Sequence, residues 1–341
     1  MTNNIVEEGK GGIRVEVVLH SVSSITGKEV ITFLVDHPRI VHAEELKHRM
    51  FSYSAASSRA IPAAKMAEQL TGMPVSFGKN QSGMQAGEEH MELVRGKFFA
   101  GLSADIIPLL EPEEAWRRAK EDAVFWSSAF ASAGYHKQVY NRLTEPFQMI
   151  RVLVTATETD NFYWLRNDKA ADPTLEIQAR CMQEAHKLSK PQVLQPGEWH
   201  LPFVAVGNSK FHTQEFYEDD LRLVRLNLDE AIKVSCARCA ATSFRATDYG
   251  LEQSLRVYDR LVNGDKVHAG ALEHCCTPMA ERVENFGTHM TRKDWINVPT
   301  DPSSWQDGIS HMDKQRKLWS GNFMGWIQYR KTIPNECYKG A

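Results

Sequence analysis

Basic and hydroxyl-bearing side chains are concentrated between residues 47 and 59 of the sequence. Lys47, His48 and Arg49 come first, and they are followed by Ser52, Ser54, Ser57, Ser58 and Arg59. Guanidinium groups give charged, bidentate donors to phosphate, and hydroxyls add short hydrogen bonds. The segment therefore predicts a phosphate cradle for a nucleotide or a dinucleotide cofactor. A solvated basic helix end followed by a serine-rich turn would contain the same residues.

The order of these residues points to one family. The run LKHRMFSYSAASSRAIP resembles the signature of the flavin-dependent thymidylate synthases, which is a basic residue, His, Arg, two residues, Ser, one residue, Asn-Glu, one residue, Ser, one residue and Arg. The chain departs from it at three places, with Lys47 for the first Arg, Ser54 for the Asn and Ala55 for the Glu. That Glu helps to order the nucleotide in the family, so its loss bears on the identity of the substrate.

Further blocks resemble the same family. Arg142 in VYNRLTEPF and the run DNFYWLRND at 160–168 correspond to blocks in which Arg142 would contact the nucleotide, Asn161 the FAD and Arg166 the pyrimidine ring. ARCAATSF at 237–244 and HAGALEH at 268–274 resemble blocks that precede the signature in cellular members, whereas here they follow it. This permuted order is similar to that of the larger phage-encoded members.

The resemblance implies an activity and a set of roles. The family makes dTMP from dUMP with methylenetetrahydrofolate, NADPH and FAD, as a homotetramer whose active sites are shared between subunits. A fixed Arg166 beside the pyrimidine would stabilise negative charge on the N3, O2 and O4 edge of the ring, with His48 as the second catalytic residue. The implied FAD contacts are Lys47, His48, Arg49, Asn161, Ser243, His268 and Glu273, and the implied contacts to the nucleotide are Ser57, Ser58, Arg59, Arg142 and Arg166. Two alternatives stay open: a relative that hydroxymethylates dUMP or dCMP for modified phage DNA, and a nucleotide-binding protein without catalysis.

The elements that must position these residues alternate without a regular strand-helix-strand cycle. Apolar periodicity predicts strands at 13–22, 29–35, 149–157 and 325–331, and helices at 42–51, 111–134, 174–189, 228–244 and 251–264. We expect residues 52–62 to be a loop, the helix at 111–134 to belong to the core, and Trp116, Trp126 and Trp164 to be core residues. The pattern indicates an α+β fold, with helices packed on a mostly antiparallel sheet. We expect one catalytic domain over 1–341, in which 67–110 is an insertion and 280–341 a C-terminal extension.

The composition of the chain argues against several classes of protein. The 40 basic and 43 acidic side chains give a formal charge of -3, which argues against a nucleic-acid-binding protein. The chain has no apolar run long enough for a bilayer and its start does not resemble a signal peptide, so we expect a cytoplasmic protein, in the host cytoplasm if phage-encoded. Six cysteines are too few for a disulfide scaffold, and Cys236 and Cys239 are interpreted as buried small hydrophobes rather than metal ligands. No Rossmann glycine motif or P-loop is present.

Overall fold

The computed structural model describes residues 5–58, 70–96, 108–208, 214–244, 246–264, 266–280 and 300–337. The candidate phosphate ligand Arg59 lies outside these ranges. Among the described residues, no helix combines the length and the apolar character that crossing a membrane requires.

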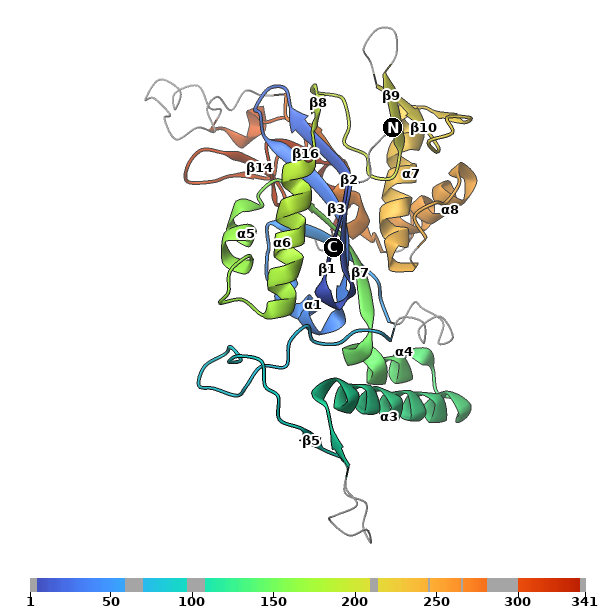
Figure 1. Ribbon diagram of the computed structural model, residues 1–341. Helices are drawn as coiled ribbons and strands as arrows, with labels where there is room; N and C mark the ends of the chain where they lie inside the picture. The colour runs from blue at the N-terminus through green and yellow to red at the C-terminus, as the bar shows by residue number, and fades with distance from the viewer. Residues whose placement is uncertain are drawn as a thin grey trace.

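A six-stranded sheet forms the centre of the molecule (Figure 1). Its strand order is β1 (Val6–Gly9), β2 (Ile13–Ser23), β3 (Glu29–Pro38), β7 (Met149–Ala156) and β4 (Phe51–Ala55), and all these neighbours are antiparallel. β8 (Gln192–Leu194) pairs with β2 in parallel. The strands predicted at 13–22, 29–35 and 149–157 are confirmed. The start of β2 alternates apolar and charged residues, whereas β3 and β7 are nearly continuous apolar runs because both of their faces are covered.

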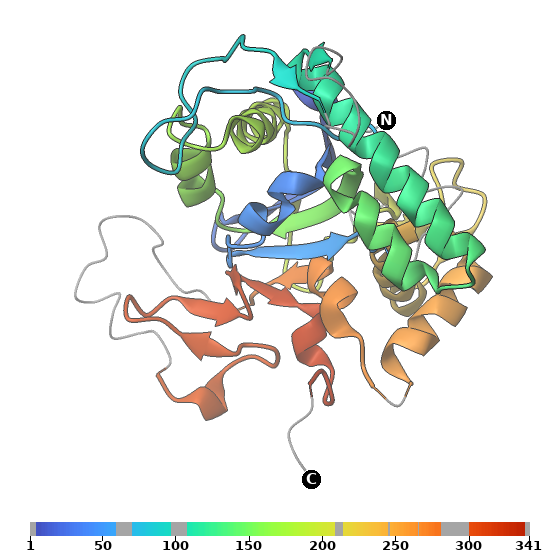
Figure 2. The same ribbon diagram turned by 90° about the horizontal axis from the view of Figure 1, so that it is seen from below.

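Helices cover both faces of this sheet, as Figures 1 and 2 show. One face packs against α5 (Asp160–Arg166) and α6 (Pro173–Leu188), and its core contains Phe33 and Val152. The other face contributes Leu34 and Leu153 to a core shared with α7 (Leu228–Ala241), α8 (Leu251–Val262) and the short helix η6 (Ala269–His274). We call these the α6 face and the α7 face. The α+β class with mostly antiparallel sheets is confirmed.

The segment that contains the basic cluster differs from the prediction. Only His42–Glu45 form a helix (α1), after the short η2 (Arg39–Val41), and residues 46–50 are turns that lead directly into β4. Residues 52–55, expected in a loop, therefore belong to a central-sheet strand. Small polar residues concealed the alternation: the side chains of Phe51 and Tyr53 pack on the α6 face, while Ser52 and Ser54 make hydrogen bonds on the other face. Residues 59–62 of the expected loop lie outside the described ranges.

The helix predicted at 111–134 is present as α3 (Pro112–Ser132), but it is not a core helix, since none of its residues is buried. Figure 2 shows α3 and α4 (Lys137–Tyr140) on the outside of the molecule, where η4 (Asn141–Phe147) connects them to β7. Trp126 is 57% exposed and Trp164 is 76% exposed, so the expectation that they belong to the core is wrong. Trp116 is half-buried, and its indole Nε1 donates a hydrogen bond to the carbonyl of Gly72 at 3.1 Å.

The described residues of the proposed insertion at 67–110 form an extended excursion whose only paired strands are β5 (Val94–Arg95) and β6 (Leu109–Leu110). The described part of the region 280–341 is more integrated than a peripheral extension. Here β16 (Trp326–Gln328) pairs with β12 (Cys276–Pro278), and Trp326 and Phe323 are fully buried. The strand predicted at 325–331 stops at Gln328, where η8 (Tyr329–Thr332) begins.

The remaining elements are short. β9 (Ala205–Asn208), β10 (Gln214–Tyr217) and β11 (Arg225–Leu226) form a small antiparallel sheet beside α7, and β13 (His311–Met312), β14 (Leu318–Ser320) and β15 (Phe323–Met324) form another near β16. Three further helical turns are η1 (Lys10–Gly12), η5 (Thr242–Phe244) and η7 (Pro302–Ser304).

Candidate functional site

The turn that carries Lys47, His48 and Arg49 is held by a buried carboxylate at the end of α1. Glu45 has no exposed surface, and its Oε1 accepts a hydrogen bond of 2.7 Å from Gln178 on α6. Its Oε2 lies 3.0 Å from His37 Nε2 and 3.3 Å from His42 Nδ1. Tyr53 on β4 donates its hydroxyl to the backbone carbonyl of Glu45 at 2.8 Å. Both ends of the turn are therefore fixed to the sheet and to α6.

Two residues that sequence analysis selected separately meet at this turn. Arg166, in the last turn of α5, donates its Nε–H to His48 Nε2 at 2.9 Å, across 118 residues of chain. Burial and the neighbouring Arg166 charge lower the pKa of His48, so its ring is neutral and Nε2 acts as an acceptor. The contact uses only the Nε–H of the guanidinium and fixes the plane of that group.

His48 and Arg49 line a cavity of about 420 Å³ beside β4, which we call the Arg49 pocket. Its other walls include Glu273 of η6, Asn322 and Gln328, together with Arg330 and Lys331 of η8. The positive charge of Arg330 is balanced by two carboxylates, because it forms ion pairs with Glu273 and with Glu336, the latter at 2.7 Å. Glu273 thus contacts a cation in this pocket, which the sequence did not indicate.

A larger cavity of about 1020 Å³ is lined by Gly270 and Ala271 of η6, and we call it the Ser54 pocket. The sequence-predicted residues Ser57, Ser243 and His268 line it, as do Arg256 and Arg260 of α8. Ser243 donates to the carbonyl of Ala55 at 3.2 Å, which joins η5 to the end of β4. Nearby, the buried Arg238 of the ARCAATSF block binds backbone carbonyls, among them that of Tyr249, a wall of this pocket. Arg238 therefore helps to position this wall.

A row of buried polar side chains crosses the α7 face of the sheet and ends in the Ser54 pocket. Gln192 Nε2 donates to Ser21 Oγ at 3.2 Å, and Ser21 Oγ lies 2.8 Å from His200 Nδ1. His200 Nε2 is 2.9 Å from Thr32 Oγ1, which is 2.8 Å from Thr155 Oγ1. The row continues from Thr155 to His274 Nδ1 at 2.8 Å, and from His274 Nε2 to Ser54 Oγ at 3.0 Å. We call this series the polar row.

The two histidines of the polar row are uncharged. Burial, with the neighbouring His20 and His274, lowers the pKa of His200 to about 3, and burial lowers that of His274 to about 3. A neutral imidazole has one donor and one acceptor nitrogen. The Gln192 amide donates to Ser21, which sets a direction for the donors along the row. In the assignment that uses each hydrogen once, every hydroxyl donates to the next Nδ1 or hydroxyl, and both histidines donate from Nε2. Ser54 then accepts from His274, and its own O–H is directed into the pocket.

The residues expected to hold a phosphate at the far end of β4 are arranged differently. Ser58 is buried and donates to Glu145 Oε1 at 2.6 Å, and the same oxygen lies 3.4 Å from Arg39 Nη2 and 3.9 Å from Arg142 Nη1. A carboxylate of the chain itself therefore occupies the centre of the expected cradle. In this arrangement the hydroxyl of Ser58 donates to the intrachain carboxylate of Glu145, and its contact with a phosphate stays a prediction.

The sequence-predicted residues are thus divided among separate places. Phe51, next to the His48 turn, and Ala55, near Ser57, are separated by the length of β4, which is about 13 Å at ~3.3 Å per residue. Arg166 lies near the Phe51 end of β4 and Arg142 lies near its Ala55 end, so the two guanidinium groups do not meet within one chain. Lys47 and Asn161 are exposed and line neither pocket.

The Ser54 pocket contains cationic and hydroxyl side chains that could bind a diphosphate group. Its volume is at the upper end of the ~300–1,000 Å³ typical of ligand sites. Two arginines and a histidine can balance a diphosphate, and the hydroxyl of Ser54 can add a hydrogen bond. The two pockets contain no described cysteine, and burial raises the pKa of Cys236, Cys239 and Cys276, which keeps those thiols protonated.

Sequence reasoning missed the polar row and the cations of α8 and η8. Thr155 could have indicated the polar row, because it is a polar residue at an inward position of the otherwise apolar strand β7. Arg256 and Arg260 stand four residues apart on one face of α8, so their spacing could have suggested a shared ligand. No sequence signal distinguishes His200 from an ordinary loop histidine.

Comparison with known proteins gives no assignment: no family model matches the chain, and no curated protein matches it.

Proposed function

We propose that this chain is a flavin-dependent thymidylate synthase-like enzyme, which methylates dUMP reductively to dTMP with methylenetetrahydrofolate, NADPH and FAD. The observation that carries the proposal is the 2.9 Å hydrogen bond from Arg166 to His48. The resemblance assigns both residues to one reaction centre from blocks far apart in the sequence, and a chance similarity gives no reason for them to touch.

Arg166 would act on the pyrimidine by electrostatics. Its Nε–H is bound to His48, so the orientation of the guanidinium is set before a ligand arrives. A pre-oriented cation beside the N3 and O2 edge would stabilise the negative charge that makes carbon-5 nucleophilic, without attack by a cysteine at carbon-6. His48 is neutral in this arrangement and serves to hold the guanidinium rather than to supply a proton from Nε2.

FAD is assigned to the Ser54 pocket because of its volume and its cationic side chains. Bound FAD would supply the hydride and carry the one-carbon unit, and the chain would supply orientation. Arg256, Arg260 and His268 would hold its diphosphate, and Ser54 would donate a hydrogen bond from the end of the polar row. This placement differs from the contacts that the resemblance implies, since His48, Arg49 and Glu273 line the other pocket.

We further propose a homo-oligomer, a tetramer by the resemblance, in which a second copy completes the site. Within one chain, the length of β4 separates Arg166 from the serines that were assigned to the nucleotide. The exposed aromatic residues Phe125 and Trp126 on α3 offer a surface that a second copy could cover.

The test is a reconstitution with purified full-length protein. The proposal predicts a yellow protein, or one that gains bound-flavin absorbance with FAD, and dTMP formation that requires dUMP, methylenetetrahydrofolate and NADPH. Protein that binds dUMP but neither binds flavin nor forms product would contradict it and favour the non-catalytic nucleotide-binding alternative.

A second candidate is the hydroxymethylation of dUMP or dCMP. Two substitutions favour it: Ser54, which is hydrogen-bonded to His274, stands where the family has Asn, and Ala55 stands where it has the Glu that orders the nucleotide. Mass spectrometry of the nucleotide product separates the two candidates, because a hydroxymethyl product, or activity on dCMP alone, would exclude the thymidylate synthase assignment.

A further inference from the structure

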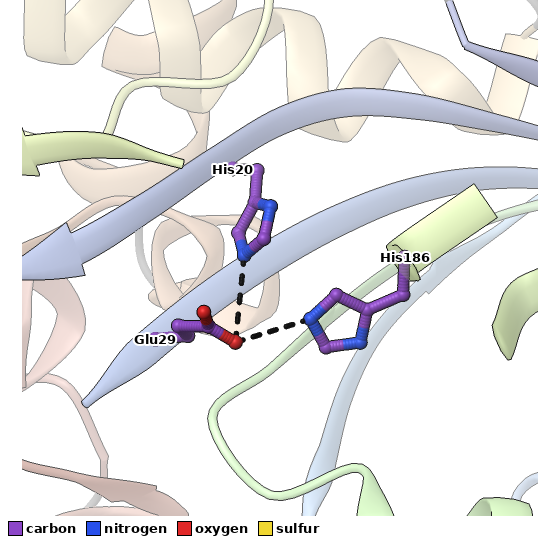
Figure 3. A group of neighbouring side chains, drawn as sticks. All are labelled: His20, Glu29 and His186. Atoms are coloured by element: carbon purple, nitrogen blue, oxygen red, sulfur yellow. Dashed lines mark hydrogen bonds and ion pairs between the residues drawn. The ribbon is translucent and has the colours of Figure 1, made fainter. Parts of the chain in front are cut away.

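Two histidines and a glutamate converge on the α6 face, away from both pockets (Figure 3). His20 is on β2, Glu29 is at the start of β3, and His186 is in the last turn of α6. The register pairs His20 with Ile31, two residues from Glu29, so the two side chains are diagonal neighbours on the same face. One ligand atom from each residue lies within 4.8 Å of the others.

His20 has no hydrogen bond that would account for its burial. Only 3% of its side chain is exposed, yet neither ring nitrogen makes a hydrogen bond within the described part of the chain. Its nearest acidic neighbour is Glu29 Oε2, at 3.7 Å from Nε2, which is too long for a hydrogen bond. A buried polar side chain without partners is costly and rare in native proteins, and it calls for a ligand or another explanation.

The distances between the donor atoms of these three residues suit ligands of a single metal ion. Ligand bonds of ~2.0–2.1 Å at tetrahedral angles put donor atoms roughly 3.3 Å apart. Glu29 Oε2 lies 3.3 Å from His186 Nε2 and 3.7 Å from His20 Nε2, and Figure 3 shows both rings directed at this oxygen. Small side-chain rotations would therefore bring all three donors to a shared ion.

The surroundings also resemble those of a metal site. His186 Nδ1 lies 3.2 Å from the hydroxyl of Tyr163, a polar contact of the kind that orients a metal-binding ring. The side chain of Glu29 is 46% exposed, which leaves the site open to solvent and to a water ligand.

A second cluster, His37, His42 and Glu45, differs because its carboxylate is already bound by other side chains. Glu45 Oε1 accepts a hydrogen bond from Gln178, and Glu45 Oε2 lies 3.0 Å from His37 Nε2 and 3.3 Å from His42 Nδ1. An ion would have to displace these contacts. We therefore assign that cluster to the support of the His48 turn.

We propose that His20, Glu29 and His186 bind one divalent transition-metal ion of the zinc class, which leaves a coordination position open to water. The two nitrogens and one oxygen are a donor set that Zn²⁺ accepts. The ion would tie the C-terminal end of α6 to the β2–β3 hairpin. This proposal is independent of the function proposed above.

The experiment uses the full chain, stripped with a chelator and titrated with Zn²⁺ by calorimetry and with Co²⁺ by visible absorption. The variants Glu29→Gln and His186→Gln alter partly exposed ligands and avoid the core position of His20. Glu184→Gln, an exposed change on the same helix, is the matched control. We expect one Zn²⁺ per chain and a higher melting temperature with zinc for the wild type and the control, and binding weakened by about 100-fold or more in both ligand variants.

Three results would overturn the proposal. They are the absence of saturable one-to-one binding, equal affinity in the ligand variants and the control, and a thiolate-to-Co²⁺ charge-transfer band that assigns the ion to cysteines. Ligand-field bands of nitrogen and oxygen coordination that disappear in His186→Gln would support it.

Discussion

The substitution Glu45→Gln tests how the His48 turn is held in place. Burial of Glu45 raises its carboxyl pKa, but the adjacent His37 and His42 outweigh this effect and lower the pKa to about 2 from an ordinary value of 4.5. At ~1.36 kcal/mol per pKa unit, this difference corresponds to about 3 kcal/mol of stability. Removal of one partner from a buried pair typically costs a similar ~3–5 kcal/mol.

The sign of the pH dependence follows from the direction of the shift. A carboxyl group whose pKa is lower in the folded protein stabilises the fold above its unfolded pKa, and this contribution is lost as the pH falls toward the folded value. Gln cannot ionise, so the difference in stability between wild type and Glu45→Gln should be greatest near about pH 6 and should shrink as the pH falls from about 4.5 toward 2.

Urea unfolding, followed by tryptophan fluorescence over this pH range, measures the difference directly. Glu121→Gln, a change at an exposed position of α3, should stay within about 0.5 kcal/mol of the wild type throughout. If the stability difference for Glu45→Gln does not change with pH, or is below ~0.5 kcal/mol near neutrality, the carboxylate does not hold the turn as argued.

Three further outcomes are expected. Arg166→Lys should lower dTMP turnover by about 100-fold while leaving flavin binding intact, because lysine has no planar group to fix against His48; steady-state kinetics beside a flavin titration measure this, and an unchanged kcat would contradict the role of Arg166. Thr155→Val keeps the volume but breaks the polar row and strands His274 Nδ1, so urea unfolding should show a loss of ~1–3 kcal/mol, whereas a neutral effect would mean that the row is not a connected network. Trp126→Glu should reduce the mass found by light scattering without lowering the melting temperature, and an unaltered mass would exclude α3 as the contact between copies.

The sequence predicted the long elements well because their periodicity comes from large side chains. The start of β2 alternates valine with charged residues, β3 and β7 are runs rich in β-branched residues and leucine, and α6 repeats apolar residues at helical spacing. The error at β4 has the opposite cause, since Ser52 and Ser54 face inward and serine has no strong preference for a strand. What places them inside is the polar row and the amides near Gln328, and no local pattern encodes those tertiary partners.

The error at α3 has another origin. Apolar and aromatic residues at helical spacing indicate burial, but periodicity cannot say whether the covering surface belongs to the same chain. In α3 no residue is buried, and Phe125 and Trp126 remain exposed. The same ambiguity affects the site: the resemblance selected His48 and Arg166 correctly as neighbours, while Ser58 and Arg142 came together around Glu145, a residue without any signal of its own.

The polar row gives a physical reason to treat the two pockets as one functional region. The α7 face buries five polar side chains where apolar residues would give more hydrophobic contact: Ser21, Thr32, Thr155, His200 and His274. Each of these groups would destabilise the fold if it lost its hydrogen-bond partner. One end of the row reaches the Ser54 pocket, and Ser52, opposite Thr155 in the register, is bound to Asn322 and Gln328 of the Arg49 pocket. Both pockets are therefore lined by side chains from one hydrogen-bonded layer, whose strands cannot shift without breaking buried hydrogen bonds. Such a layer fixes the position of β4 relative to η6, whose residues line both pockets.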